Sequence, residues 1–179
     1  MKFTMTNIQK AITTAQRLLK KYNLHPPINV KQLIETMGIT VIEIPFNNPG
    51  VSGCIKRSSK NGQPVIIVNK NHMETRKRFT LAHELAHAIL HSTNDLHVDT
   101  EQIYFRDENS QLAEDIKEIQ ANQFAAELLM PKHLLTEDIK KETAKINIKE
   151  HLNIIIDKLK EKYNVSTEAM TIRIGNILY

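Results

Sequence analysis

The sequence of 179 residues is poor in the features that define several classes of protein. It has a single cysteine, Cys54, and no tryptophan. A lone cysteine can form neither an intramolecular disulfide nor a thiolate-rich zinc cluster, so a disulfide-stabilised secreted scaffold is excluded. No segment approaches the ~20 apolar residues of a membrane-spanning helix, and the N-terminus lacks the apolar stretch of a secretory signal. We therefore expect a cytoplasmic protein that does not contact a membrane.

A strong excess of charge of one sign is also absent. The chain has 24 basic and 20 acidic residues, a formal net charge of +4. Its basic residues fall in short, separated groups, which is typical of solvated helix faces rather than of a nucleic-acid groove. These groups are Lys20-Lys21, Arg76-Lys77-Arg78 and Lys140-Lys141. We expect no direct binding to nucleic acid.

The hydrophobic pattern predicts an α+β fold in one domain, residues 1–179, with helices before and after a small sheet. An N-terminal helix is expected around Ile8 to Leu19. A short helix from Val30 to Met37 follows, with Asn29 as its N-cap and Gly38 just beyond its end. Further helices are expected at about 72–91, 108–130, 147–162 and 166–177.

Three runs rich in β-branched residues, 39–44, 51–57 and 65–68, predict a small, mostly antiparallel sheet. Asn61-Gly62 indicates a hairpin turn between the last two runs. Residues 93–107 are expected to form a loop, and residues 136–145 a charged connection that is partly helical. The chemically informative core covers about 29–131, and additional C-terminal helices fill 136–179.

The most informative segment is the predicted helix over residues 79–91. Apolar side chains cover well over half of its circumference, so it is expected to be buried almost all round. The remaining polar sector contains no Lys or Arg. Its members are Thr80, His83, Glu84, His87 and His91. Ionisable groups that converge in a buried sector need a partner, and a divalent metal ion is the simplest one.

The residues 83–87 form the pattern H-E-x-x-H, which assigns separate roles to its members. His83 and His87, at i and i+4, hold their imidazoles side by side and suit two ligands of one metal ion. Glu84 is rotated away from this pair and is the candidate general base that takes a proton from a water molecule. The alternative is a pair of core histidines hydrogen-bonded to backbone or carboxylate groups, which the Glu between them disfavours.

A catalytic zinc site uses three protein ligands, so a third is expected from elsewhere. A further histidine six residues beyond His87 is excluded because that position is Thr93. Glu118 heads an apolar face of the predicted helix 108–130, where Ala121 and Ala125 would allow close packing against the histidine helix. Glu114, one turn earlier on the same face, is the competing candidate, and Glu118 is preferred.

For two other polar residues the sequence leaves two possible roles open. Asn122 can either orient a metal ligand or remain solvated. His91 is favoured as a residue that satisfies the carbonyls at the end of its helix, with substrate binding as the alternative. The sequence places no transition-state-stabilising residue at the metal; the candidates are His97, Tyr104 and His133.

Cys54 is expected to be a buried, unreactive thiol, because no neighbour in sequence supplies a setting that would lower its pKa. Its strand, residues 50–55, is taken to lie at an edge of the sheet. Such a strand can align an extended peptide through backbone hydrogen bonds.

Two segments carry a resemblance to a known family: Arg78-Phe79-Thr80-Leu81-Ala82-His83-Glu84-Leu85-Ala86-His87 and Glu118-x-x-Ala121-Asn122-x-Phe124-Ala125-x-x-Leu128-Leu129-Met130-Pro131. Together they resemble the ImmA/IrrE family of zinc metallopeptidases. The likeness spans about residues 29–131, includes Asn69, and extends loosely to residues 163–166 and Arg173.

This resemblance implies a minimal zincin-like fold with zinc held by His83, His87 and Glu118, and with Glu84 as the base. Manganese or iron can replace zinc in related sites. Members of the family are known for site-specific cleavage of helix-turn-helix repressors in prophages, mobile elements or stress responses. We therefore expect a zinc-dependent metallo-endopeptidase whose partner is such a repressor. The alternative is a non-cleaving regulatory or toxin–antitoxin-type interaction protein with the same fold, and the sequence assigns no oligomeric state.

Overall fold

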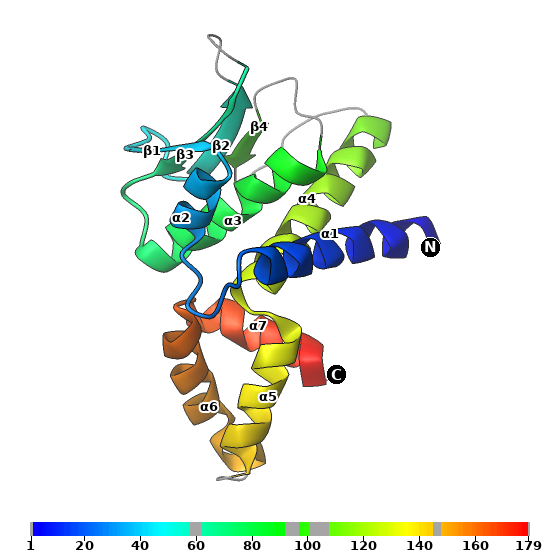
Figure 1. Cartoon of the computed structure of the whole chain (residues 1–179), viewed down its shortest axis with the longest axis vertical. Helices are drawn as coiled ribbons and strands as arrows, with labels where there is room; N and C mark the ends of the chain where they lie inside the picture. The colour runs from blue at the N-terminus through cyan, green and yellow to red at the C-terminus, as the bar shows by residue number, and fades with distance from the viewer. Residues whose placement is uncertain (1, 58–61, 92–96, 101–107, 145–147, 179) are drawn as a thin grey trace.

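The computed structural model places two helices before a small sheet and the remaining helices mostly after it (Figure 1). It describes the backbone of residues 2–57, 62–91, 97–100, 108–144 and 148–178, and the side chains of residues 7–56, 62–91, 116–144 and 152–178. This mixture of helices and sheet confirms the α+β expectation.

The helices and strands of the described residues follow the predicted order closely. The helices are α1 (Lys2–Lys21), α2 (Val30–Thr36), α3 (Glu74–Leu90), α4 (Glu108–Leu129), α5 (Lys132–Thr143), α6 (Ile148–Tyr163) and α7 (Thr167–Leu178). The strands are β1 (Thr40–Ile44), β2 (Val51–Arg57), β3 (Pro64–Asn69) and β4 (His97–Thr100).

The start and end of α2 match their sequence signals. The side chain of Asn29 accepts a hydrogen bond from the backbone N–H of Gln32 at 3.1 Å, which satisfies a donor at the start of the helix. Gly38 follows the helix with φ +79°, a left-handed conformation that glycine adopts without strain. Both expectations are confirmed.

Two segments differ from their sequence expectations. Residues 132–143, expected in part as a charged connection, form the continuous helix α5, because Leu135 and Ile139 make a buried i,i+4 stripe beneath the charged face. Residues 97–100, expected within a loop, form the strand β4. This strand is four residues long, and backbone pairing rather than a hydrophobic pattern defines it.

The sheet has the strand order β1-β3-β2-β4. β2 pairs antiparallel with both β3 and β4, whereas β1 pairs parallel with β3. The sheet is therefore mostly antiparallel, as expected. The expectation that residues 50–55 form an edge is wrong, because β4 pairs with β2 and occupies that edge.

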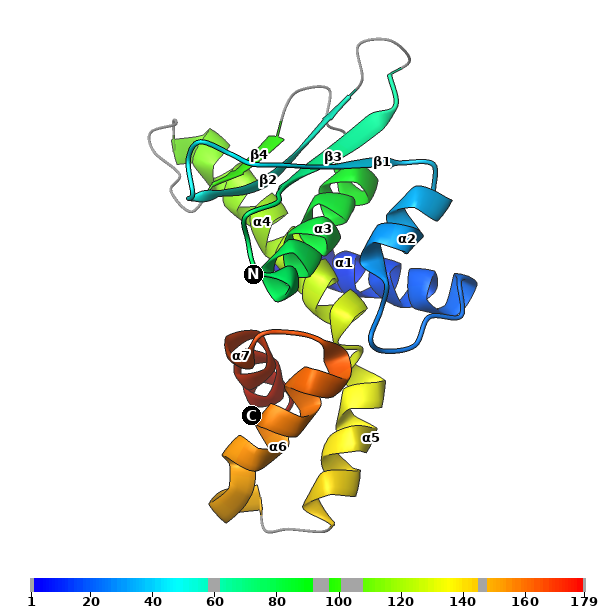
Figure 2. The ribbon, with the colours of Figure 1, turned by 90° about the vertical axis from the view of Figure 1, so that its left-hand side faces the viewer.

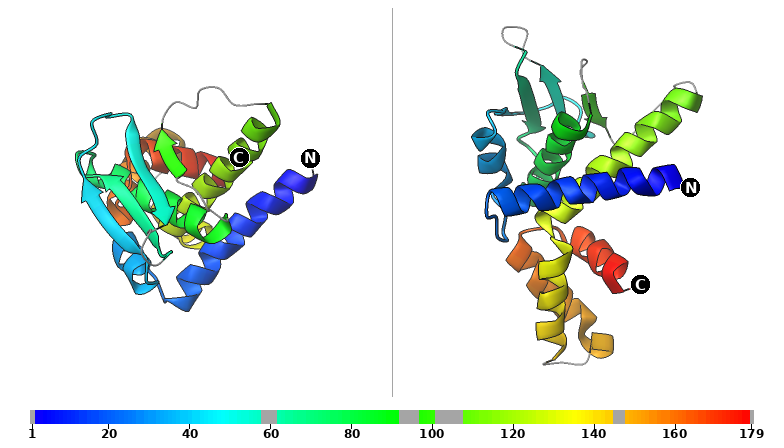
Figure 3. Two further views of the ribbon diagram at one scale, coloured as in Figure 1. Left: turned by 90° about the horizontal axis from the view of Figure 1, so that it is seen from above. Right: turned by 45° about the vertical axis from the view of Figure 1, so that its right-hand side comes forward.

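Helix α3 lies between the sheet and α4, with the sheet covering one of its sides (Figure 2). The sheet contributes Ile55, Ile66 and Val68 to the hydrophobic core, and α3 contributes Leu81 and Leu85. On the far side of α4, α1 lies beside it in both views of Figure 3. α3 is thus enclosed on two sides, which explains why its middle turns are buried.

Gly53 lets α3 approach β2 closely. A Cβ atom at Gly53 would lie 2.5 Å from the Thr80 methyl group and 2.9 Å from the Ile67 carbonyl oxygen. Distances this short cannot be relieved by moving a flexible side chain alone, since one of the two atoms is backbone. The helix that carries the histidines is therefore positioned by the absence of a side chain on β2.

Gly53→Ala is expected to lower the free energy of unfolding by about 1–3 kcal/mol, because the added methyl group forces α3 away from β2. The matched control is Gly175→Ala in α7, where nothing lies within 4 Å of the added Cβ. That substitution should stabilise the protein by about 0.5–1 kcal/mol through higher helix propensity. Urea denaturation of the three proteins measures both effects, and equal stability of wild type and Gly53→Ala would contradict the close approach.

The C-terminal helices are tied to α3 by one buried guanidinium. Arg78 donates to the carbonyl oxygens of Ile28 at 2.8 Å, Asn164 at 3.0 Å and Tyr163 at 3.4 Å. Burial removes water from the guanidinium and thereby lowers the pKa of Arg78. The three carbonyl oxygens replace the lost water as hydrogen-bond acceptors. Arg173 of α7 forms a second buried connection, to the Glu127 carboxylate and the Met130 carbonyl oxygen of the α4 end.

Among the described residues, no helix combines the length and apolar character that crossing a membrane requires.

Candidate metal centre

His83 and His87 lie one turn apart in the middle of α3, as their spacing predicts. Their ring centroids are 4.8 Å apart and the rings are tilted by 55°. His83 is 4% exposed and His87 is fully buried. Ala82 and Ala86, which precede the two histidines in sequence, are fully buried as well. The core around α3 therefore fixes both imidazoles in an environment that excludes most water.

Glu118 of α4 meets the two imidazoles. Its Oε2 lies 3.1 Å from Nε2 of His83, and its Oε1 lies 3.2 Å from Nε2 of His87. The three side chains offer one ligand atom each within 4.8 Å of one another. Ala121 and Ala125, which follow Glu118 along α4, are fully buried, in keeping with the close helix packing that the sequence suggested.

The donor set fits a divalent metal ion. The Nε2 atoms of His83 and His87 are 3.0 Å apart, and two lone pairs repel at that distance unless a proton or a cation lies between them. A tetrahedral ion with zinc-type bond lengths separates its ligand atoms by about 3.3 Å, close to the distances found here. Two imidazole nitrogens and one carboxylate oxygen are also the ligand types of catalytic zinc sites.

Asn122 orients one of the imidazoles. Its Oδ1 lies 2.9 Å from Nδ1 of His83. An amide oxygen only accepts hydrogen bonds, so Nδ1 of His83 carries the proton and Nε2 keeps its lone pair directed toward Glu118 and His87. Of the two alternatives open for Asn122, orientation of a ligand has the support of this contact.

Glu84 lies beside the histidine pair and is fully buried. Its carboxylate is close enough to β2 to act on Cys54: burial first, and then the negative charge of Glu84, raise the pKa of the Cys54 thiol. Cys54 is 8% exposed. The buried, protonated thiol agrees with the expectation that Cys54 is unreactive.

The other candidates from the sequence have varied positions. His91 follows the last residue of α3, and its ring centroid lies 5.2 Å from that of His87. Its backbone N–H donates to the His87 carbonyl oxygen. His133 is exposed near the start of α5, beyond the end of the helix that carries Glu118. The side chains of Glu114, His97 and Tyr104 lie outside the described residues.

A pocket of about 860 Å³ opens next to Asn122, and the sequence analysis did not identify it. Its walls come from three distant segments: the start of α3, the second half of α4, and α7 with the residues just before it. The only sequence signal was the loose family likeness at residues 163–166 and Arg173. No local sequence pattern predicts that these three segments lie together.

Comparison with known proteins gives the chain a consistent set of relatives. The model of the Peptidase M78 family, described as the IrrE N-terminal-like domain, matches residues 34–175. The chain is 32% identical over 123 residues to the "uncharacterized immunity region protein 2" of Bacillus phage phi105, a match that covers 68% of this chain and 69% of that protein.

Two longer relatives carry the name "radiation response metalloprotease IrrE". The chain is 40% identical over 73 residues to that of Deinococcus deserti and 39% identical over 73 residues to that of Deinococcus radiodurans. Each match covers 41% of this chain, but only 25% and 21% of the two proteins.

A solved structure shares the fold over most of the chain. It is a Mycobacterium tuberculosis transcriptional regulator, with a TM-score of 0.56 and 18% sequence identity. The likeness covers 93% of this chain and 55% of the regulator. At this identity the similarity concerns the fold.

Proposed function

The chain belongs to the Peptidase M78 family of the IrrE N-terminal-like domain, and from this premise we propose that it is a zinc-dependent metallo-endopeptidase with a minimal zincin-like fold. The observation that carries the proposal is the convergence of His83, His87 and Glu118, three ligand types of a catalytic zinc site, beside the buried Glu84. The names of the two IrrE relatives support the same activity.

The residues of the site divide the work of peptide hydrolysis. His83, His87 and Glu118 would hold the ion, and Asn122 keeps His83 in the tautomer that binds metal. A zinc ion bound there would lower the pKa of a water molecule and polarise a carbonyl group. Manganese or iron could supply the same chemistry. Glu84 would accept the proton of the attacking water and return it to the leaving nitrogen of the peptide.

Burial of the site strengthens the electrostatic interactions on which these roles depend. His87 and Glu84 are both fully buried, and electrostatic interactions in such an environment are larger than in water. Glu118 is 22% exposed, so the cluster is more open on the α4 side than on the α3 side. A substrate is therefore expected to approach over α4.

The sheet supplies a second element of substrate binding. Since β4 takes the edge next to β2, the role first given to residues 50–55 passes to β4. The backbone of an edge strand can align an extended peptide by adding a further strand. Four residues of β4 give little discrimination between side chains, so selectivity would need contacts elsewhere.

We further propose that the substrate is a helix-turn-helix repressor in the cytoplasm. The family resemblance implies this class of substrate, and the relative from phage phi105 is named as an immunity region protein. A protease inside the cell has to spare other proteins, which favours recognition of a folded partner and cleavage in one flexible segment.

A helix-turn-helix repressor encoded beside this chain's gene would be the natural test substrate, and we expect it to be cut at a single site outside its DNA-binding core, whereas casein is cut poorly. The test incubates both proteins with the purified chain and one equivalent of zinc or manganese, and identifies fragments by mass spectrometry. Rapid cutting of casein at many sites would contradict a regulatory role and would indicate a general peptidase instead. An intact repressor held in a stable complex would favour the non-cleaving interaction protein.

A further inference from the structure

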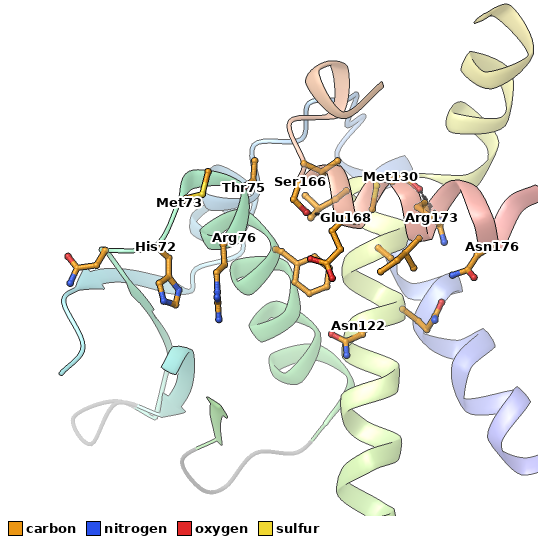
Figure 4. Close-up of a pocket in the computed structure, with 18 residues that line it drawn as sticks. His72, Met73, Thr75, Arg76, Asn122, Met130, Ser166, Glu168, Arg173 and Asn176 are labelled. Atoms are coloured by element: carbon orange, nitrogen blue, oxygen red, sulfur yellow. Dashed lines mark hydrogen bonds between the residues drawn. The ribbon is translucent and has the colours of Figure 1, made fainter. Parts of the chain in front are cut away.

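The pocket beside Asn122 has a distinct chemical character (Figure 4). Apolar side chains from all three walls line it, and several of them are buried. They include Phe79, Ala126, Leu129, Met130, Val165 and Ala169. A concave apolar site of this size is typical of a binding pocket rather than of a packing defect.

The floor of the pocket carries no net charge to select a charged ligand. Arg173 lines it, but its guanidinium is paired with the buried carboxylate of Glu127 and bonded to the Met130 carbonyl oxygen. The rim carries both signs, Arg76 from α3 and Glu168 from α7. Arg76 is also held by the Ser52 hydroxyl at 2.9 Å. These features favour an uncharged, apolar occupant.

Two large apolar side chains on the rim are exposed to solvent. Met73 is 78% exposed at the start of α3, and Ile172 is 58% exposed on α7. Figure 4 shows Met73 and Asn176 at well-separated parts of the lining. An apolar side chain entering the pocket would remove this surface from water, which is a favourable change.

The pocket lies next to the candidate metal centre, because Asn122 lines the pocket and also contacts His83. Phe79 lies one turn before His83 on α3, and Asn122, which contacts His83, lies one turn after Glu118 on α4. Four residues of an α-helix span about 6 Å, so Phe79 lies about 6 Å and Thr75 about 12 Å along α3 from His83. An extended peptide advances about 3.3 Å per residue, so this stretch corresponds to roughly two to four residues of substrate.

We propose that the pocket binds a bulky apolar side chain of the protein substrate, two to four residues from the cleaved bond. The inference rests on the proposed peptidase function, because the metal centre defines where the substrate is cut. It adds a determinant of specificity that the β4 edge cannot supply. The C-terminal helix α7, which is distant from the histidines in sequence, would thereby take part in substrate selection.

The test compares Ile172→Glu with the matched control Ile154→Glu. Ile154 lies on α6, is also 58% exposed, and does not line the pocket. Repressor variants that change one residue near the cleaved bond at a time to Leu, Phe or Ala are offered to each zinc-loaded protein, and cleavage is followed by mass spectrometry. Wild type should prefer Leu or Phe to Ala at one position, two to four residues from the cut. Ile172→Glu should reduce that preference about tenfold or more, and Ile154→Glu should leave it within about twofold.

A second variant changes the volume of the pocket rather than the polarity of its rim. Ala126→Leu narrows the floor and should lower the preference for Phe more than that for Leu. Circular dichroism checks that each variant folds. A preference that neither Ile172→Glu nor Ala126→Leu alters would overturn the pocket assignment even if cleavage proceeds.

Binding without cleavage separates the pocket from the proposed activity. Methyl NMR of zinc-loaded Glu84→Gln is recorded with a Gly/Ser dodecapeptide that contains one central Leu, and with its Ala counterpart. Shifts at Ile172 and Met130 with the Leu peptide alone would support the pocket even if wild type cuts nothing, in which case the proposed hydrolysis fails. Equal spectra with the two peptides, together with no cleavage preference, would contradict the pocket.

Discussion

Glu84→Gln is expected to reduce cleavage of the repressor by at least about 10²-fold, while the protein stays folded and keeps its metal. An amide has almost the shape of the carboxylate but cannot accept the proton of the attacking water. Glu84 is fully buried beside His83 and is not one of the three converging ligand residues, so metal content should remain near that of wild type. Quantified repressor fragments and elemental analysis measure the two quantities on the same sample.

The control for Glu84→Gln is a conservative exchange outside the site, such as Glu137→Gln on the exposed face of α5. It should leave the cleavage rate unchanged. Undiminished cleavage by Glu84→Gln would mean that another residue activates the water or that the activity belongs to a contaminating protease. Loss of metal in Glu84→Gln would instead indicate that Glu84 is itself a metal ligand.

His87→Ala is expected to lower metal affinity by at least about 10²-fold, and the metal content after dialysis should fall from near one ion to almost none. His87 is fully buried, and its Nε2 lies 3.2 Å from Glu118. Removing the ring takes away a ligand and leaves the Glu118 carboxylate with fewer compensating groups. Thermal unfolding with and without added zinc should show a smaller zinc-dependent shift in Tm than in wild type.

His133→Ala is the matched control for the metal experiment, since His133 is exposed on α5 away from the cluster. It should keep full metal content. Glu118→Gln and Glu114→Gln, compared in the same assay, decide the third ligand. Metal loss in Glu114→Gln alone would show that the preference for Glu118 was wrong, and full occupancy in His87→Ala would remove the proposed site altogether.

The helices and strands with strong local signals could be predicted from the sequence. Asn29 and Gly38 mark the ends of α2 because a side-chain acceptor and a left-handed glycine satisfy groups within a few residues of each other. β4 gave no such signal, since its four residues are defined by hydrogen bonds to β2 about 45 residues away in sequence. That pairing also explains why the wrong strand was expected at the edge. A single domain over residues 1–179 stays a prediction.

The candidate site divides in the same way. The spacing of His83 and His87 is a property of one helix, so their side-by-side arrangement follows from α-helical geometry. The approach of Glu118 depends on how α4 packs against α3, and the buried alanines of α4 were the only hint. The pocket depends on three segments that share no periodicity, so it became visible only in the folded structure.

The three carbonyl contacts of Arg78 identify two connections of this chain in which an inserted residue would be destabilising. One acceptor, Ile28, lies in the connection between α1 and α2, and the other two, Tyr163 and Asn164, lie where α6 ends and the turn to α7 begins. One inserted residue adds up to about 3.5 Å of chain, more than the whole length of a hydrogen bond. An insertion at either place would pull an acceptor away from a buried cation, so these two short connections are constrained in length by a residue of the helix that carries the histidines.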